Sequence, residues 1–287
     1  MKPALSIILP AKNEADSLRE LLPRLRECQP DAEITVVDDG STDQTQTVCA
    51  QHGVRLVRGP YSMGNGAAVK RGTRAASGDL LVFMDADGQH DPADIERLLG
   101  EYRSGGYDML VGARSGNSQA NTHRWLANGL YNRLASWMVG QRVADLTSGF
   151  RVVDAAKFRE FLHLLPNGFS YPTTITMSFF RSGYAVGYLP IRARERRGKS
   201  HIRLLRDGMR FLIIIFKVGS LYSPLKLFLP ISLLSFVAGA GLYAHTYTSE
   251  GRFTNMSALL FMTALLVFLI GLVSEQITAL MFSRKDQ

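Results

Sequence analysis

The stretch that decides the fold reads Leu81-Val82-Phe83-Met84-Asp85-Ala86-Asp87-Gly88-Gln89-His90-Asp91-Pro92. Its apolar start predicts a short buried strand, and the polar run after it places carboxylates at the carboxyl end of that strand. Because side chains two residues apart leave a strand on the same side, Asp85 and Asp87 are predicted to point into one cleft. Such a pair suits a hard cation, Mg²⁺ or Mn²⁺, with phosphate oxygens completing the coordination.

The sequence around this stretch repeats the same arrangement. Short apolar runs alternate with amphipathic segments, which predicts an α/β fold whose mostly parallel, Rossmann-like sheet is covered on both faces. The predicted strands are Leu5–Leu9, Ile34–Val37, Val54–Val57, Leu80–Met84 and Met109–Val111. The predicted helices are Glu14–Glu27, Asp43–His52, Asn65–Ala76 and Pro92–Arg103. Ligands bind such sheets at the carboxyl ends of the strands, which is where the polar motifs fall.

Two further polar motifs follow predicted strands. Pro10-Ala11-Lys12-Asn13-Glu14 comes directly after the first strand, and its bland interpretation is a helix cap with an acidic first turn. Val36-Val37-Asp38-Asp39-Gly40-Ser41-Thr42-Asp43 ends the second strand and opens a helix. Its carboxylates could accept hydrogen bonds from a nucleotide base or ribose, or Ser41 or Asp43 could simply cap the helix. Paired aspartates at a strand end are costly for structure alone, so we favour the binding site.

The last part of the chain is far more apolar. Leu225–Tyr243 carries one charge, Lys226, and Ser257–Phe282 carries one charge, Glu275. Each is long enough to cross a bilayer core, which takes about 20 helical residues. The sequence therefore predicts a hairpin of transmembrane helices over 224–247 and 256–282, with a buried soluble hairpin as the alternative. We interpret Glu275 as a partner of the basic Arg284-Lys285 tail.

Basic residues outnumber acidic ones, 33 to 25, and give a net charge of +8, which indicates an anionic partner such as nucleic acid, an acidic membrane or a phosphorylated substrate. Many of them gather in one stretch: Arg192, Arg194, Arg196, Arg197, Lys199, Arg203, Arg206, Arg210 and Lys217. Within it, Ile202–Leu221 mixes basic and apolar residues at helical spacing, which predicts an amphipathic helix over 201–223 in the headgroup layer. Positive charge on this side places the 1–200 domain and both termini in the cytoplasm, on a multi-pass protein of the cell (inner) membrane.

Other features are unremarkable. Cys28 and Cys49 lack metal-ligand spacing and are interpreted as reduced thiols. Met1-Lys2-Pro3-Ala4 leads straight into the first predicted strand, so we expect no signal peptide.

The three motifs together resemble those of inverting family 2 glycosyltransferases with the GT-A fold. The closer resemblance is to the dolichol-phosphate-mannose synthase-like and polyprenyl-phosphate glycosyltransferase branch, whose members carry Pro-Ala-x-Asn-Glu, Asp-Asp-Gly-Ser-x-Asp and Asp-Ala-Asp-x-Gln-His in this order. It covers residues 5–200 and extends to the hairpin. The resemblance implies a metal-dependent hexosyltransferase that moves a sugar from a UDP- or GDP-linked donor to undecaprenyl or dolichyl phosphate, for cell-envelope or glycan assembly.

The resemblance also implies roles for individual residues. The donor site comprises Pro10, Asn13, Glu14, Asp38, Asp39, Gly64, Asp85 and Ala86, and the metal ligands are Asp85, Asp87 and Gln89. The acceptor phosphate is assigned to Arg114, Arg124, Asn128 and Ser200, and the catalytic set to Asp87, Arg124, Arg197 and Lys199. Arg194, Arg197, Lys199 and Ser200 fit a loop that closes over the phosphates.

The chain departs from the branch at two places. Asn65 stands where the branch usually has Lys in a Gly-Lys-Gly turn beside the nucleotide. Thr173 and Thr174 fall in a segment where many relatives have Glu. For this reason no sugar specificity is carried over.

A lipid phosphate is already an anionic nucleophile, so the reaction needs no strong general base. The enzyme must instead offset the repulsion between acceptor phosphate and donor diphosphate, which explains an acidic metal site beside a basic cluster. We expect a nucleotide sugar, a polyprenyl phosphate and the bilayer as partners, and no nucleic acid. A homo-oligomer is a further possible assembly.

Two other functions stay open. One is a family 2 transferase with a glycolipid or polysaccharide acceptor, although the Gln-x-x-Arg-Trp motif of processive synthases is not visible. The other is a membrane-tethered nucleotide- or nucleic-acid-binding protein without catalysis, although no nucleic-acid module is recognisable.

Overall fold

The computed structural model describes residues 4–114, 122–168, 171–192, 216–217 and 219–283. The chain divides into two compact units, Met1–Trp137 with Gln141–His201 and Met138–Gly140 with Ile202–Gln287. The predicted helix over 201–223 lies mostly outside the described residues. The predicted domain boundary after residue 200 also falls there, so both stay predictions.

The first unit is built on a seven-stranded sheet with the order β3-β2-β1-β4-β6-β5-β7. Its strands are β1 Leu5–Ala11, β2 Glu33–Asp38, β3 Arg55–Arg58, β4 Leu80–Phe83, β5 Met109–Arg114, β6 Arg151–Asp154 and β7 Val186–Ile191. Only β6 runs against its neighbours, β4 and β5, and the other neighbouring pairs are parallel. The prediction of a mostly parallel α/β sheet is confirmed.

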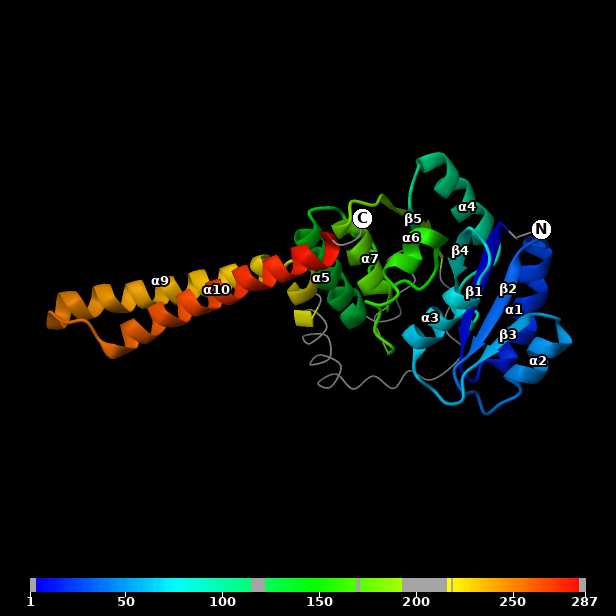
Figure 1. Cartoon of the computed structure of the whole chain (residues 1–287), viewed down its shortest axis with the longest axis horizontal. Coiled ribbons are helices and arrows are strands. Elements are labelled where there is room, and N and C mark those ends of the chain that lie inside the picture. The colour runs from blue at the N-terminus through cyan, green and yellow to red at the C-terminus, as the bar shows by residue number, and fades with distance from the viewer. Residues whose placement is uncertain (1–3, 115–121, 169–170, 193–215, 218, 284–287) are drawn as a thin grey trace. The chain divides into compact units, whose positions relative to one another are not determined.

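Helices connect these strands (Figure 1). They are α1 Ala15–Cys28, α2 Thr45–Gln51, α3 Asn65–Ala75, α4 Asp94–Gly105, α5 Thr122–Val139, α6 Ala155–Glu160 and α7 Tyr171–Arg181. The strands and helices predicted up to residue 111 all form, with ends shifted by a few residues. The strands β6 and β7 were not predicted, because β6 opens with a charged arginine and β7 contains Gly187 and Pro190.

The central strands are covered on both faces, as a parallel sheet requires. Ile7, Ile8 and Leu9 of β1 are all fully buried. The helix α3 approaches this strand closely at Gly72, where a Cβ atom would lie 2.4 Å from Ile8 Cγ2. The loop after β2 caps the first helix, because Asp43 Oδ2 accepts the N–H of Ala15, the first residue of α1, at 3.0 Å.

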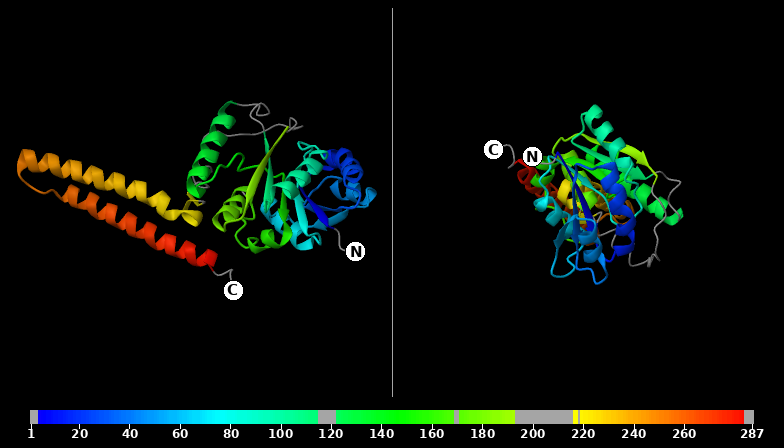
Figure 2. Two further views of the ribbon diagram at one scale, coloured as in Figure 1. Left: turned by 90° about the horizontal axis from the view of Figure 1, so that it is seen from above. Right: turned by 90° about the vertical axis from the view of Figure 1, so that its right-hand side faces the viewer.

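The second unit contains the long helices α9 Pro224–Glu250 and α10 Asn255–Ser283, which lie side by side in Figures 1 and 2. Their most apolar windows have mean hydropathies of 1.9 and 2.6 and are only 11% and 17% buried. A soluble core hairpin would bury most of this surface, so the exposure favours the membrane-spanning interpretation. Close packing at Gly239, against Leu260 and Phe261, holds the two helices together.

Glu275 of α10 has a partner that the sequence did not indicate. Its Oε2 accepts the Leu225 N–H at 3.2 Å and so satisfies one N–H group in the first turn of α9. The predicted pairing with Arg284 or Lys285 lies outside the described residues.

Candidate active site

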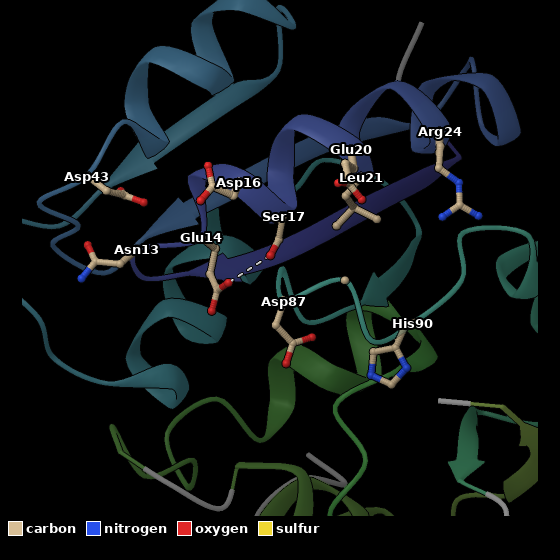
Figure 3. A pocket seen from close by; sticks show the side chains of 11 residues that line it. Asn13, Glu14, Asp16, Ser17, Glu20, Leu21, Arg24, Asp43, Asp87 and His90 are labelled. Atoms are coloured by element: carbon tan, nitrogen blue, oxygen red, sulfur yellow. Dashed lines mark hydrogen bonds between the residues drawn. The ribbon is translucent and has the colours of Figure 1, made fainter. Parts of the chain in front are cut away.

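A cavity of about 430 Å³ opens beside the carboxyl ends of β1 and β4. Figure 3 shows the side chains of α1 along one side of it, and Asp87 and His90 from the turn after β4 on the other. Its charged lining is mainly acidic: Glu14, Asp16, Glu20, Asp43 and Asp87, with Arg24 as the basic member. An anionic ligand would be repelled by this wall unless a cation accompanied it.

The turn after β4 presents the two predicted metal ligands differently. Asp85 has a side chain that is 36% exposed, and Asp87 lines the cavity. Asp87 Oδ1 accepts the Gln89 N–H at 3.1 Å, which keeps the turn compact. The Asp85 carboxylate packs closely against the backbone at Gly149, where a Cβ atom would lie only 2.8 Å from Asp85 Oδ2.

These residues fit a hard divalent cation only in part. In the described segments no three His, Cys, Asp or Glu side chains converge as a metal-binding group. Asp85 and Asp87 supply oxygen atoms of the kind that Mg²⁺ and Mn²⁺ prefer, and Gln89 could add an amide oxygen. The remaining positions would go to donor phosphates and water, which is the usual arrangement for Mg²⁺ at phosphate sites.

The surroundings of Asp85 keep it ionised. Burial alone would raise the pKa of this carboxyl, but His90 and the charges of Arg114 and Arg151 lower it below its usual value. His90 Nε2 lies 3.9 Å from Asp85 Oδ2, and the His90 ring stacks on Phe150 with centroids 4.9 Å apart. A carboxylate held in its charged form is ready to bind a cation.

The aspartates at the end of β2 are engaged within the protein. Asp39 Oδ1 accepts the Met63 N–H at 2.8 Å, and Oδ2 accepts Ser62 Oγ–H at 2.7 Å and the Gly64 N–H at 2.8 Å. Burial raises the pKa of Asp39, but these hydrogen bonds and the charge of Arg71 outweigh burial and lower it. Because a carboxylate offers about four acceptor positions, Asp39 is close to saturated and shapes the 62–64 turn.

Asp38 is similarly enclosed. It is 1% exposed, accepts the Ser41 N–H at 2.7 Å, and lies 3.5 Å from Arg58 Nε. A ligand at these strand ends would therefore meet the turns that Asp38 and Asp39 organise, Gly40–Ser41 and Ser62–Gly64, before it met either carboxylate.

Asn13 joins the loops after β1 and β2. Its backbone is left-handed, with φ at +56°, and its side-chain oxygen accepts the Thr42 N–H at 2.8 Å. Its own N–H donates to Ser41 Oγ at 2.9 Å. Glu14 follows it, accepts Ser17 Oγ–H at 3.3 Å and lines the cavity together with Asn13. The structure thus brings Asn13, Glu14 and Asp87 to one cavity.

Other predicted donor residues do not line this cavity. Pro10 is half-buried within β1, and Ala86 is 1% exposed and belongs to the hydrophobic core. Gly64 lies at the start of α3 with φ at +100°. The N–H groups at that end donate to the 167–168 backbone, Gly66 to Gly168 at 3.2 Å and Ala67 to Asn167 at 2.9 Å.

Arg114 is tied to an aspartate. Its Nε and Nη2 donate to Asp145 Oδ2 and Oδ1 at 2.9 and 3.0 Å, and Nη2 also donates to Thr147 Oγ1 at 2.6 Å. Burial would lower the pKa of Arg114, but Asp145 raises it, so the guanidinium stays charged. This bidentate pair fixes the 145–148 loop, and the predicted phosphate contact of Arg114 stays a prediction.

Six predicted residues cannot be placed by their side chains. Arg124 and Asn128 lie in α5, but their side chains are outside the described part of the structure. Arg197, Lys199 and Ser200, like Arg194, fall in 193–215, also outside it. Thr173 of α7 is 1% exposed and accepts the Tyr131 O–H at 3.1 Å, so its hydroxyl serves packing of α7 on α5.

Sequence reasoning missed several site residues. Lys12 Nζ donates to Ser62 Oγ at 3.0 Å, which brings a cation next to the Asp39 network. Arg151 is fully buried, donates to Thr176 Oγ1 at 3.2 Å, and adds positive charge behind Asp85. Lys12 and His90 stood inside the quoted motifs without a role, whereas nothing in the sequence marked Arg151 as buried.

Known proteins resemble this chain in both units. The model of glycosyl transferase family 2 matches residues 6–162, and the model of the GtrB C-terminal hairpin matches residues 223–280. The chain is 32% identical over 206 residues to an undecaprenyl-phosphate mannosyltransferase of Micrococcus luteus, which covers 66% of this chain and 83% of that protein.

Two more comparisons extend the picture. The low-salt glycan biosynthesis hexosyltransferase Agl6 of Haloferax volcanii is 26% identical over 223 residues, covering 74% of this chain and 54% of Agl6, so the chain spans about half of that relative. A glucosyl-3-phosphoglycerate synthase from Mycobacterium tuberculosis, solved with Mn²⁺ and UDP, superposes with a TM-score of 0.60 at 21% identity, covering 75% of this chain and 78% of that one. At this identity the likeness shows the fold alone.

Proposed function

Because the chain belongs to glycosyl transferase family 2, we propose that it moves a sugar from a nucleotide-sugar donor to a polyprenyl phosphate at a membrane surface. The observation that carries the proposal is the Asp85–Asp87 turn at the end of β4, in a chain that ends in a GtrB-type hairpin. The name of the Micrococcus luteus relative supports the acceptor class.

The donor would lie over the carboxyl ends of β1, β2 and β4. Asp85, Asp87 and Gln89 would hold Mg²⁺ or Mn²⁺ against its diphosphate, and a bound cation would neutralise charge on the departing nucleoside diphosphate. Asn13 and Glu14 would border the nucleotide. The Mn²⁺ and UDP bound by the Mycobacterium tuberculosis synthase are compatible with this arrangement.

The acceptor phosphate would attack directly. One of its anionic oxygens forms a bond to the anomeric carbon while the bond from that carbon to the donor diphosphate breaks, and the nucleoside diphosphate leaves with the electron pair. No proton needs to move, and in-line attack inverts the anomeric configuration. Arg124, Asn128, Arg197, Lys199 and Ser200 are the proposed phosphate contacts, whereas Arg114 would act by positioning the 145–148 loop.

The proposal includes the orientation of the protein in the membrane. The α/β unit and both termini would lie in the cytoplasm, because the basic stretch precedes the first span. Sugar transfer would then take place where the lipid phosphate meets water.

The test is transfer by purified full-length protein in lipid nanodiscs. Labelled UDP- and GDP-sugars are offered with undecaprenyl phosphate, first after chelation and then with Mg²⁺ or Mn²⁺ restored. We expect a lipid-linked product only with metal. Full-rate transfer by chelated protein would refute the metal assignment, and transfer to a glycolipid but never to a prenyl phosphate would favour the other acceptor class.

A further inference from the structure

The carboxylate of Asp85 lies against the backbone of Gly149, a residue distant from it in sequence. A Cβ atom at Gly149 would lie 2.8 Å from Oδ2, 3.1 Å from Oδ1 and 3.2 Å from Cγ of Asp85, so the whole carboxylate group packs on this one glycine. The Asp85 side chain is nevertheless 36% exposed, which leaves part of it accessible to a ligand. Gly149 therefore forms one wall of the position that Asp85 occupies.

The Asp85 carboxylate is what excludes a side chain at position 149. The three atoms nearest to the Cβ position all belong to Asp85. The backbone itself does not require glycine, because Gly149 does not have the positive φ that glycine adopts more readily than other residues. An alanine at this position would therefore fit the backbone but collide with the carboxylate.

Two buried side chains hold the backbone of this wall. The Tyr171 hydroxyl, from the start of α7, donates to the Gly149 carbonyl at 3.2 Å. The Arg151 guanidinium donates to the Ser148 carbonyl through Nη2, and its Cζ lies 5.7 Å from the centre of the Tyr171 ring. Tyr171 is 1% exposed and Arg151 is completely buried, so water does not compete for these hydrogen bonds.

The strand β5 holds the same segment from another direction. The Gly112 carbonyl accepts Ser148 Oγ–H at 2.7 Å, and the Gly112 N–H donates to the Phe150 carbonyl at 2.9 Å. Asp145 Oδ1 accepts the Ser148 N–H at 3.1 Å. Residues 148–150 are thus bound by groups from several elements, so the wall behind Asp85 is rigid.

We propose that Gly149, Tyr171 and Arg151 are positioning residues that fix the orientation in which the Asp85 carboxylate binds a divalent cation. The inference rests on the proposed function for the identity of this ligand. Groups behind a metal ligand affect affinity, because a carboxylate that is already oriented loses less freedom when the cation binds. The three residues act through Asp85 and do not touch the cation.

The variant Gly149→Ala tests the wall directly. The added methyl group collides only with the end of the short Asp85 side chain, so the carboxylate should turn away while the fold is kept. Full-length protein in phosphatidylcholine nanodiscs is titrated with Mn²⁺, alone and with UDP or GDP added, and the free ion is measured by electron paramagnetic resonance. We expect Mn²⁺ affinity to fall about 10- to 100-fold, the usual effect of disturbing groups behind a metal ligand.

The matched control is Gly100→Ala. Gly100 lies in α4, and a Cβ atom there would have no neighbour within 4 Å. This variant should bind Mn²⁺ like the parent protein. An equal loss of affinity in the control would show that the effect is not specific to Asp85 and would overturn the proposal.

A second variant, Tyr171→Phe, tests the support behind the wall. It keeps the ring next to Arg151 and removes only the hydroxyl that holds the Gly149 carbonyl. We expect Mn²⁺ affinity to fall about three- to tenfold, since one hydrogen bond is lost. Thermal unfolding followed by circular dichroism shows whether each variant is folded, and Tyr171→Phe provides the test if Gly149→Ala is not.

The possible results separate this inference from the proposed function. Parent-like Mn²⁺ affinity in a folded Gly149→Ala variant, or in Tyr171→Phe if the first does not fold, would overturn the inference and leave the function untouched. Absence of Mn²⁺ binding by the parent protein would overturn both this inference and the metal assignment. Because the measurement needs no turnover, neither result depends on the choice of donor or acceptor.

Kinetics supply a second readout that a purely structural role would not produce. Gly149→Ala should raise the Mn²⁺ concentration for half-maximal transfer by the same factor as the binding constant, and should leave the KM for undecaprenyl phosphate unchanged. An equal rise in the acceptor KM would show general damage to the site and would overturn the assignment to Asp85.

Discussion

The two pairs of aspartates at the ends of β2 and β4 look alike in sequence but are used differently. Asp39 accepts hydrogen bonds from Ser62, Met63 and Gly64 and is 4% exposed. Asp85 keeps 36% of its side chain exposed, and Asp87 lines a cavity. The β2 pair therefore organises the Gly40–Ser41 and Ser62–Gly64 turns, whereas the β4 pair is accessible to a ligand. The hydrogen bonds that a strand-end carboxylate already accepts within the protein therefore distinguish a structural role from a ligand-binding one.

The largest expected effect tests the β4 pair. Asp87→Ala should reduce the rate of transfer about a thousandfold or more. The variant loses several kcal/mol of stabilisation by the cation, and each loss of about 1.4 kcal/mol lowers the rate tenfold. The melting temperature should fall by no more than about 2–4 °C, because Asp87 is half-buried and its substitution removes the hydrogen bond from the Gln89 N–H, worth about 1 kcal/mol. Asp16→Asn is the control: it also lines the cavity, but its side chain is 97% exposed. Near-normal turnover of Asp87→Ala would show that Asp87 does not bind a cation needed for transfer.

A third aspartate extends the comparison to the Arg114–Asp145 pair. Arg114→Met leaves Asp145, which is 5% exposed, without its bidentate partner. Breaking a buried pair costs about 3–5 kcal/mol, and because the Arg114 side chain is 28% exposed we expect about 3 kcal/mol or less. Chemical denaturation measures it.

The matched control for that pair is Arg19→Met. Arg19 pairs with Asp16 at 2.6 Å, but their side chains are 45% and 97% exposed, so the loss should be below about 1 kcal/mol. Equal losses for the two variants would mean that the Asp145 pair is no more than a surface contact.

The expected loss for Asp39→Asn is smaller and affects stability before chemistry. In the variant, the side chain at position 39 has an NH₂ group in place of one of the two carboxylate oxygens. The hydrogen-bond donors that face this oxygen in the parent protein lose their acceptor. A buried hydrogen bond that is left unmade costs about 1–3 kcal/mol. The melting temperature should fall by about 2–4 °C for each kcal/mol. Residual turnover should show a raised KM for the donor with kcat nearly kept. Unchanged stability with abolished kcat would instead make Asp39 a direct ligand.

Much of this arrangement could be predicted from the sequence, because the information is local. The apolar runs gave the strands, and the polar motifs at their ends located Asn13, Glu14 and Asp87 at one site. The antiparallel β6 could not be predicted, since its first residue, Arg151, is a buried charge held by contacts distant in sequence. The saturation of Asp39 depends on residues 23–25 positions away, which motif spacing does not reveal.

The smallest effect is the pH dependence that Asp39 gives to the stability of the fold. Folding lowers the pKa of Asp39, so the unfolded chain binds more protons as the pH falls below about 5. The stabilisation is thus fully present above the unfolded pKa, about 3.9, and is lost as the pH drops through the lower folded value. Asp39→Asn should therefore flatten the acid limb of the unfolding free energy plotted against pH. Parallel acid limbs for Asp39→Asn and the parent protein would mean that the hydrogen bonds around Asp39 do not favour its charged form, and the contrast with the β4 pair would then rest on exposure alone.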